Sequence, residues 1–222
     1  MKKAFTMIEL VFVIVIIGIL SSLISPSFQR ATVKEAADQI ASHIRYTQQL
    51  ALNDNKFDTT DRYWFRRRWQ ILFANTVTGS NGKWTYTIFS DSDTINGNPQ
   101  VTEIAKNPLD PKNKLLSGGY GSSIKYYSSG TTINPKITKE LNLGLKYGIT
   151  NILFGGGCPN GKRISFDYLG RPLQGAVKNL NKKYSYNNNN RLIQTDCTIT
   201  ITDGTDTEII VITPETGYCY IK

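Results

Sequence analysis

A single carboxylate, that of Glu9, lies near the start of an otherwise apolar run that spans residues 5–24. An unpaired charge in an apolar environment costs several kcal/mol, so acidic residues in such segments are rare and usually functional. An ordinary membrane anchor has no need of this residue. We therefore expect Glu9 to have a specific role, with an accidental or protonated glutamate as the alternative.

The stretch RYWFRRRWQ, residues 62–70, combines positive charge with aromatic surface. Arginine contacts to phosphates, together with stacking of Trp or Tyr on bases, are the chemistry of sequence-tolerant DNA binding. The stretch is therefore a candidate nucleic-acid site. Its arginines are Arg62, Arg66, Arg67 and Arg68.

A structural role is the favoured interpretation of the same stretch. Strand alternation would place one set of side chains on a core face and leave Arg66 and Arg68 as solvated neighbours. Arg67 has the parity of the core face, so we expect the strand to begin only after it. The predicted core face consists of Phe65, Trp69, Ile71 and Phe73.

No combination of residues in the sequence resembles a catalytic or metal site. His43, the only histidine, has no evident nucleophile or carboxylate partner, and we expect it to be a solvated helix residue. The glycines at 155–157 lack the lysine and the following helix of a phosphate-binding loop. An acidic stretch around Gly97 departs from the calcium-binding EF-hand pattern by one extra residue, so we expect a plain turn. We therefore expect no enzyme, no metal and no cofactor. The residues of the acidic stretch are Asp91, Asp93, Asn96 and Glu103.

Three cysteines, Cys158, Cys197 and Cys219, lie in the last third of the chain without a CxxC or histidine-containing cluster, so a zinc site is not expected. Outside the cytoplasm, one disulfide and one spare thiol is the default arrangement. We predict a Cys158–Cys197 disulfide, with Cys219 as a buried thiol that faces inward beside Ile221. The pair Cys158–Cys219 stays open as an alternative.

The composition bounds the architecture that positions these residues. The length of 222 residues, with 40% hydrophobic and 19% charged residues, indicates one ordinary domain in addition to a membrane or signal segment. The net charge of +9 allows an acidic partner such as nucleic acid or anionic lipid, although a merely basic surface is more common.

Residues 5–24 predict a membrane-spanning helix. A helix of this length is about 30 Å long, which matches the hydrocarbon core of a bilayer. Lys2 and Lys3 precede it, so the positive-inside rule predicts a cytoplasmic N-terminus and an external remainder. A secretory signal peptide is the alternative, but residues 20–22 are a poor cleavage site.

An amphipathic helix follows the apolar run directly. Pro26 is expected to kink the helix rather than end it, because helical periodicity resumes at once. The helix is expected to end near Leu52, before Asn53, Asp54 and Asn55. One apolar stripe recurs at intervals of three, four and seven residues. Its members are Val33, Ala37, Ile40, Ile44 and Ala51.

The remainder of the chain has the pattern of a β-rich domain. Two runs on either side of Asn81-Gly82 predict a hairpin, and KRISFDYLG predicts a strand that ends at Gly170. Three short strands at the C-terminus predict an antiparallel meander. The expected fold is α+β and pilin-like, with a long N-terminal helix packed by its outer half on an antiparallel β-sheet domain.

The sequence KKAFTMIEL, followed by an unbroken apolar run, resembles the N-terminal signature of type IV pilins and type II secretion pseudopilins. The resemblance implies cleavage by prepilin peptidase between Ala4 and Phe5 and N-methylation of Phe5. Pro26 matches the helix-kinking proline of the family, whereas Ala4 stands where glycine is usual. The implied parts are a leader (1–4), a membrane and assembly helix (5–28), its amphipathic continuation (29–54) and an extracytoplasmic β-rich domain (55–222).

The same resemblance implies a role for Glu9 in assembly. In a filament of packed helices its carboxylate can meet the Phe5 ammonium of a neighbouring subunit, which offsets the cost of burial and selects the axial register. The implied partners are other pseudopilins or pilins, prepilin peptidase, an inner-membrane assembly platform and membrane lipid. The implied location is the bacterial inner membrane, with a periplasmic domain that is later built into a filament.

A second resemblance concerns the C-terminal half. ISFDYLGRP and the closing PETGYCYIK are similar to segments of H-type pseudopilins and FimT-like minor pilins. This resemblance implies a minor pseudopilin of a type II secretion system. The alternative is a minor pilin of a type IV pilus or DNA-uptake system that binds DNA through the arginines of residues 62–68.

Overall fold

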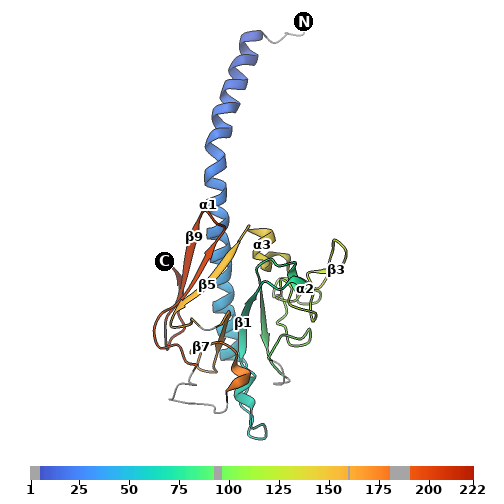
Figure 1. Cartoon of the computed structure of the whole chain (residues 1–222), viewed down its shortest axis with the longest axis vertical. Helices are drawn as coiled ribbons and strands as arrows, with labels where there is room; N and C mark the ends of the chain where they lie inside the picture. The colour runs from blue at the N-terminus through green and yellow to red at the C-terminus, as the bar shows by residue number, and fades with distance from the viewer. Residues whose placement is uncertain (1–5, 93–96, 160, 181–190) are drawn as a thin grey trace.

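The computed structural model describes residues 6–92, 97–159, 161–180 and 191–222, of which residues 22–31 and 179 are described by their backbone only. One long helix projects from a β-rich domain (Figure 1). The predicted α+β architecture, with an N-terminal helix packed on antiparallel sheets, is confirmed.

Helix α1 (Met7–Asn53) runs through Pro26 without interruption and ends one residue beyond the predicted Leu52. Asp54 follows as the C-cap residue, and its N–H bonds to the carbonyl oxygen of Leu50 at 2.9 Å. A search of the described residues finds no helix with both the length and the apolar character of a membrane span.

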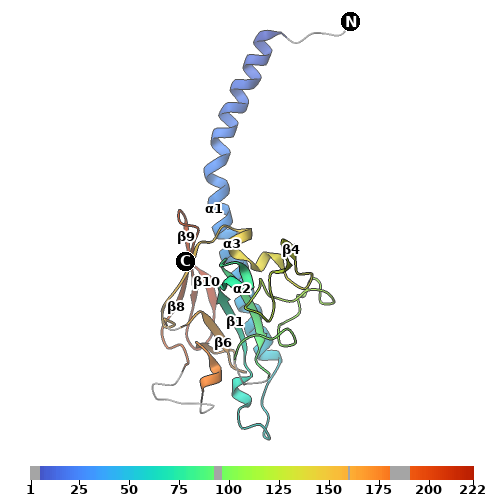
Figure 2. The same ribbon diagram turned by 45° about the vertical axis from the view of Figure 1, so that its right-hand side comes forward.

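Two four-stranded antiparallel sheets form the domain. Their strand orders are β2-β1-β6-β7 and β10-β9-β8-β5. Helix α1 contacts both sheets and therefore holds them in one body (Figure 2). The first sheet contains β1 (Trp69–Ala74), β2 (Thr85–Ser90), β6 (Arg163–Phe166) and β7 (Pro172–Gln174). The second contains β5 (Asn151–Gly156), β8 (Cys197–Thr202), β9 (Thr207–Ile212) and β10 (Cys219–Ile221).

A third, two-stranded sheet and several short helices lie outside these layers. The small sheet contains β3 (Tyr127–Ser129) and β4 (Thr132–Ile133). The short helices are α2 (Val77–Ser80), α3 (Leu143–Lys146), η1 (Trp64–Arg66), η2 (Lys139–Leu141) and η3 (Val177–Asn179).

The predicted apolar stripe of α1 is buried at the centre of the core. Four of its five members have no exposed surface, and Ala51 is 4% exposed. Ala36 and Ala41 are buried beside them, so the contact face of the helix is built partly of small side chains. The opposing core side chains include Phe73, Tyr86, Ile164, Ile199, Ile210 and Ile212.

The predicted hairpin and meander are both present. Strand β1 pairs with β2 from Trp69–Ser90 to Ala74–Thr85, with Asn81 and Gly82 at positive φ in the turn. Strands β8, β9 and β10 pair consecutively and antiparallel. Burial alternates along β8 as predicted, because Cys197, Ile199 and Ile201 face the core.

The structure contains the predicted Cys158–Cys197 disulfide, with the two Cα atoms 5.1 Å apart. It links the turn after β5 to the first residue of β8, which are paired strands. Cys219 is a free, buried thiol, as predicted. Burial raises the pKa of its thiol to about 12, although the nearby Arg45 guanidinium opposes the rise.

The prediction that His43 is a solvated helix residue is wrong. Its Nδ1 lies 2.6 Å from the hydroxyl oxygen of Tyr86, a side chain with no exposed surface. Gln39 completes the network, because its Nε2 donates to the Tyr86 hydroxyl at 2.7 Å and its Oε1 accepts from the Tyr147 hydroxyl at 2.7 Å. Tyr86 can therefore donate its own proton to His43 Nδ1. Burial lowers the pKa of His43 to about 4.

This burial predicts a pH dependence of stability. Since the unfolded chain protonates His43 near pH 6.5 and the folded chain only near pH 4, stability is lost as the pH falls between these values. Unfolding by urea of the full chain in detergent micelles, followed by tryptophan fluorescence, measures the loss. Between pH 7 and pH 4.5, we expect protonation of His43 to lower the free energy of unfolding by roughly 2 to 3 kcal/mol.

His43→Gln is the control for the other groups that titrate in the same range. The variant is expected to lose less stability than the natural chain over this interval, because position 43 no longer takes up a proton. Equal losses in the two proteins would contradict the burial of a neutral His43.

Candidate functional site: the N-terminal segment and the arginine-rich segment

The first functional residue, Glu9, lies in a capping box at the start of α1. Thr6 is the N-cap residue, and its Oγ1 accepts from the Glu9 N–H at 3.4 Å. In return, Glu9 Oε2 accepts from the Thr6 N–H at 2.9 Å and from Thr6 Oγ1 at 2.8 Å. The spacing Thr-x-x-Glu is the sequence signal for a capping box. We did not predict this capping box from the sequence.

The capping box fixes the position of Glu9 relative to the start of the helix. Both hydrogen bonds that the carboxylate accepts from described residues use Oε2, and both donors belong to Thr6, a neutral residue. Glu9 therefore obtains hydrogen bonds, but no opposite charge, from Thr6. The predicted cleavage between Ala4 and Phe5, and the predicted pairing with the Phe5 ammonium, concern residues outside the described part of the chain.

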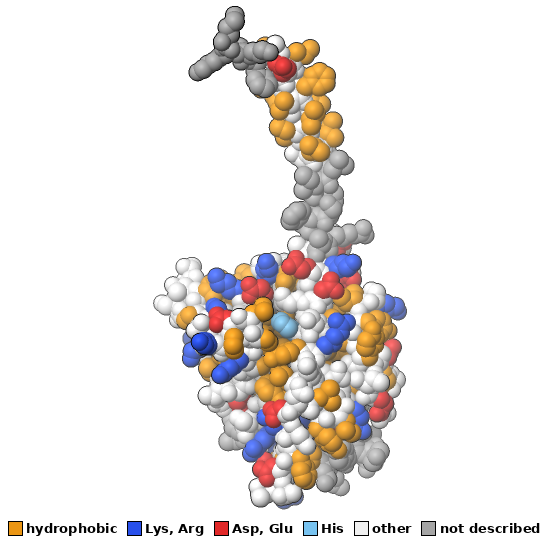
Figure 3. Space-filling model, turned by 180° about the vertical axis from the view of Figure 1, so that it is seen from behind, with side chains coloured by type: hydrophobic (Ala, Val, Ile, Leu, Met, Phe, Trp, Pro, Cys, Tyr) orange, Lys and Arg blue, Asp and Glu red, His pale blue; other side chains and the backbone are white. Residues whose placement is uncertain are grey.

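The apolar side chains that follow are uncovered. The large hydrophobic side chains between Met7 and Leu20 are 44–83% exposed (Figure 3). Surfaces of this size on a folded protein mark contact with a membrane or with other proteins. The first part of α1 is thus a surface for association, whereas its last part belongs to the core.

The second candidate site, the arginine-rich segment, is largely built into the fold. Residues 64–66, before the strand, form the 3₁₀-helix η1, and Trp64 and Phe65 are only 9% and 4% exposed. Both pack against Val177 and Leu180. Because their ring faces are buried, neither can stack on a nucleic-acid base.

Two of the arginines have partners within the chain. Arg66 Nε donates to the carbonyl oxygen of Leu180 at 2.8 Å, and its guanidinium lies 4.0 Å from the ring centre of Tyr63. Arg67 Nη2 lies 2.9 Å from Asp61 Oδ2, and its carbonyl oxygen accepts from Ser90 Oγ at 2.8 Å. These contacts attach the segment to β2 and to η3.

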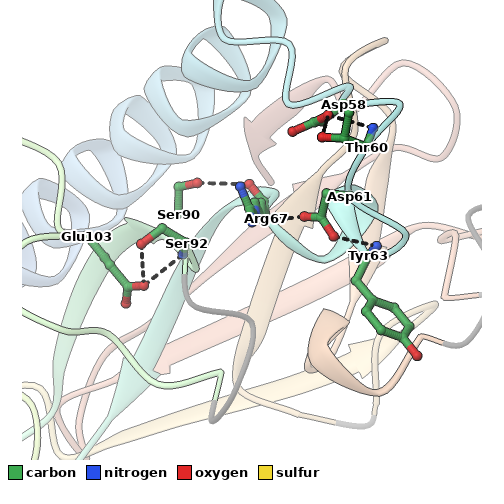
Figure 4. A network of polar contacts seen from close by, with 8 residues as sticks. All are labelled: Asp58, Thr60, Asp61, Tyr63, Arg67, Ser90, Ser92 and Glu103. Carbon is green, nitrogen blue, oxygen red and sulfur yellow. Dashed lines mark hydrogen bonds and ion pairs between the residues drawn. The ribbon is translucent and has the colours of Figure 1, made fainter.

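Figure 4 shows how these contacts continue on both sides of Arg67. Asp61 Oδ1 also accepts from the Tyr63 N–H at 2.8 Å, which closes the turn before η1. Beyond Ser90, Glu103 Oε1 accepts from the N–H of Ser92 at 2.7 Å and from its hydroxyl at 2.8 Å. The carboxylates thus order the turns around the arginine-rich segment.

The remaining arginines differ from each other. Arg68 is 5% exposed, so the prediction that it is solvated is wrong. It is buried because β1 begins at Trp69, directly after it, and Arg68 lies beside Trp64 and Phe166 at the end of the core. The expectation that the strand starts after Arg67 is correct. Arg62 is exposed.

A third group of residues was not anticipated from the sequence. Gln48 of α1 donates through Nε2 to the carbonyl oxygens of Gly170 at 2.8 Å and Thr216 at 2.7 Å. These oxygens belong to the β6–β7 and β9–β10 turns, one from each large sheet. Gly217 has a φ of 63°, and a Cβ there would lie 2.6 Å from Gln48 Nε2, so glycine is required. A lone glutamine on a helix gives no sequence signal for such a role.

Metal binding has no support among the described residues, where no group of three or more His, Cys, Asp or Glu side chains could hold an ion. Asp91 and Glu103 of the acidic stretch are both buried. Asp93 and Asn96 lie outside the described residues, so the plain turn expected there is untested.

Residues 1–25 match the family model of the prokaryotic N-terminal methylation motif. No curated protein and no solved structure is significantly similar to the chain. The motif and the fold together support a type IV pilin-like precursor, of the kind that prepilin peptidase processes and that assembles with other pilins. The motif also suggests a membrane-anchored N-terminus.

The hydrogen bonds of Gln48 predict that its replacement destabilises the fold more than replacement of its neighbour Gln49. Gln48→Ala leaves two carbonyl oxygens without their donor, and we expect the free energy of unfolding to fall by about 1–3 kcal/mol. Gln49→Ala, at an exposed position of the same helix, should change it by less than about 0.5 kcal/mol. Urea unfolding of the full chain measures both, and similar losses would contradict a specific role for Gln48.

The arginine contacts predict a structural effect of mutation. Arg66→Ala should lower the free energy of unfolding by about 1–2 kcal/mol, because a hydrogen bond and a cation–π contact are lost. Arg62→Ala removes the same charge from an exposed position, and we expect a change below about 0.5 kcal/mol. A result in which both variants are as stable as the natural chain, and both bind DNA less well at low salt, would instead favour the nucleic-acid role.

Proposed function

We propose that this chain is a structural subunit, a minor pseudopilin of a type II secretion system, that prepilin peptidase cleaves between Ala4 and Phe5. Its role is assembly into a short periplasmic filament, not catalysis. The observation that carries the proposal is the methylation motif at residues 1–25 at the start of a helix whose outer half is packed into an α+β domain.

The two halves of α1 have different tasks in this proposal. The outer half is held by the core, so the β domain is rigidly attached to the helix. The first half is covered by apolar side chains on all sides and needs apolar surroundings, which membrane lipid provides before assembly and neighbouring helices provide afterwards.

In this proposal, Glu9 sets the axial register between neighbouring subunits. Its hydrogen bonds to Thr6 hold the carboxylate at the N-terminal end of the helix but leave it negatively charged. Cleavage would create a free amine on Phe5, and the Phe5 ammonium of a neighbouring subunit could neutralise Glu9. A pair of this kind in a low-dielectric environment is costly to leave incomplete, so it favours one axial offset between subunits.

The alternative, a minor pilin of a pilus or DNA-uptake system, requires an exposed basic surface on the arginine-rich segment. Of the four arginines, Arg66 and Arg67 have partners within the chain, and Arg68 is buried. These contacts weigh against the alternative. The DNA-uptake alternative would be favoured if the full chain bound DNA in a salt-sensitive way and lost this binding when Arg62, Arg66, Arg67 and Arg68 were replaced.

A pair of substitutions tests whether Glu9 acts between subunits or only within its own helix. Glu9→Gln removes the charge and should leave leader removal intact but reduce assembly by about tenfold or more. Thr6→Ala breaks the capping box at a cost of about 1 kcal/mol and keeps the carboxylate, so assembly should persist. Mass spectrometry of the mature N-terminus measures leader removal, and chemical crosslinking of the chain to neighbouring subunits in the intact cell envelope measures assembly.

The proposal fails if the native chain retains its first four residues. It also fails if Glu9→Gln assembles normally, or if Thr6→Ala reduces assembly as much as Glu9→Gln, because Glu9 would then act only as a helix cap.

A further inference from the structure

One loop of the domain has the composition of a binding surface. Residues 106–114, KNPLDPKNK, carry three lysines around Leu109, which is 94% exposed. Leu109 is the most exposed of the large hydrophobic side chains in the described part of the chain. A leucine in this position has no role in folding, because it contacts no core.

The loop is ordered by its own hydrogen bonds. Asn107 Oδ1 accepts from the Leu109 N–H at 2.9 Å, and the Asn107 N–H donates to the Lys114 carbonyl oxygen at 2.9 Å. Asn107 Nδ2 donates to Thr138 Oγ1 at 3.1 Å, which joins the loop to the neighbouring segment. Pro108 and Pro111 restrict the backbone further. Leu109 is thus presented on a preorganised loop, which lowers the entropic cost of binding.

Asp110 and Glu140 offset only part of the positive charge around Leu109. Leu115 bridges to Ile137, and its N–H donates to the Lys136 carbonyl oxygen at 2.8 Å, so residues 136–139 lie beside the loop. In the described part of the chain, none of the five lysines of this surface forms an ion pair. We name this surface the lysine loop; its residues are Lys106, Leu109, Lys112, Lys114, Lys136 and Lys139.

The opposite side of the domain has the complementary charge. Residues 192–222 contain five acidic residues against one lysine, whereas residues 101–150 contain seven lysines against three acidic residues. In Figures 1 and 2 the second sheet and the loops around β3 and β4 lie on opposite sides of the domain.

The acidic side also offers apolar surface at one end of its sheet. Cys197 and Cys219 both pair with Ile212, so Asp196 and the β9–β10 turn lie at the same end. Tyr218, which is 60% exposed, stacks on Tyr220 with ring centres 5.8 Å apart. Glu215 is exposed in the same turn. We name this the acidic end; its residues are Asp196, Glu215, Tyr218 and Tyr220.

We propose that the lysine loop of one copy docks on the acidic end of a second copy, with Leu109 against the Tyr218–Tyr220 pair and lysines beside Asp196 and Glu215. Because the two surfaces lie on opposite sides, the contact between the two copies is head to tail rather than two-fold symmetric. The inference rests on the proposed filament role and assigns its subunit contact.

The other acidic partners fit this surface less well. A phosphate backbone offers nothing apolar for Leu109 to contact. Lys139 lies toward the end of the domain from which α1 projects, because the carbonyl oxygen of its neighbour Glu140 accepts from Gln39 Nε2 at 3.0 Å. A lipid surface supplies negative charge there but no aromatic side chains for Leu109. A second copy provides both the charge and the aromatic surface.

Site-specific photo-crosslinking of the full chain in native membranes tests the contact. Leu109 is replaced by a photoreactive amino acid, and we expect an adduct of two chains whose crosslinked peptide lies within residues 192–222. Adducts only with nucleic acid, with lipid, with a different protein or with another segment of the chain would each overturn the proposal.

Charge reversal identifies the contribution of the lysines. Lys106→Glu with Lys112→Glu should reduce the adduct roughly fivefold or more, and Asp196→Lys with Glu215→Lys in the same chain should restore at least about half of it. Lys34→Glu, at an exposed position of α1, is the matched control and should leave the adduct unchanged. Failure of the rescue, or an equal effect of the control, would overturn the assignment of the partner surface.

Leader removal is measured by mass spectrometry in the same samples, so that the two proposals are separated. A chain that keeps its first four residues but crosslinks to residues 192–222 would contradict the proposed processing and support the contact. A processed, assembled chain without this crosslink would contradict the contact alone.

Discussion

The packing of the outer half of α1 against both sheets is the contact on which the rest of the structure depends. The buried face of the helix combines Val33, Ile40 and Ile44 with four alanines, so its backbone approaches the strands closely. Gln48 adds a polar tie to the β6–β7 and β9–β10 turns. Because one helix contacts both sheets, neither sheet can move without disturbing the same core.

This attachment links the domain to assembly. The first half of α1 exposes apolar side chains that only a membrane or neighbouring helices can cover, whereas the second half is fixed in the core. Any axial register set near Glu9 is therefore transmitted through a continuous helix to the domain. In the proposed filament, contacts made at the far end of α1 would in this way position the β domain.

Positively charged side chains have different roles in the arginine-rich segment, at Arg45 and in the lysine loop. In the arginine-rich segment, Arg66 and Arg67 hold loops in place. Arg45 bonds through Nε and Nη2 to the Cys219 carbonyl oxygen at 3.1 and 2.7 Å, which ties β10 to the helix. In the lysine loop, by contrast, the charges face solvent and form no ion pair with any residue that the structure describes. Positive charge alone therefore does not identify a binding surface, since its availability depends on the neighbouring carboxylates and carbonyl groups.

The sequence by itself determined the parts that depend on local patterns. The methylation motif, the apolar stripe of α1, the β1–β2 hairpin and the C-terminal meander all follow from short-range spacing, because backbone periodicity decides which side chains share a face. The Cys158–Cys197 pairing was also predicted, although Cys158–Cys219 could not be excluded without the distance between strands.

Only the tertiary structure decided the features that depend on contacts between distant segments. His43 is half-buried because Tyr86, on another element, hydrogen-bonds to it, and Arg68 is buried beside Trp64 and Phe166 at the end of the core. Strand β5 and the role of Gln48 were not predicted, since neither has a local pattern of its own. Burial and hydrogen-bond partners are properties of the whole packed chain, and spacing along the sequence does not contain them.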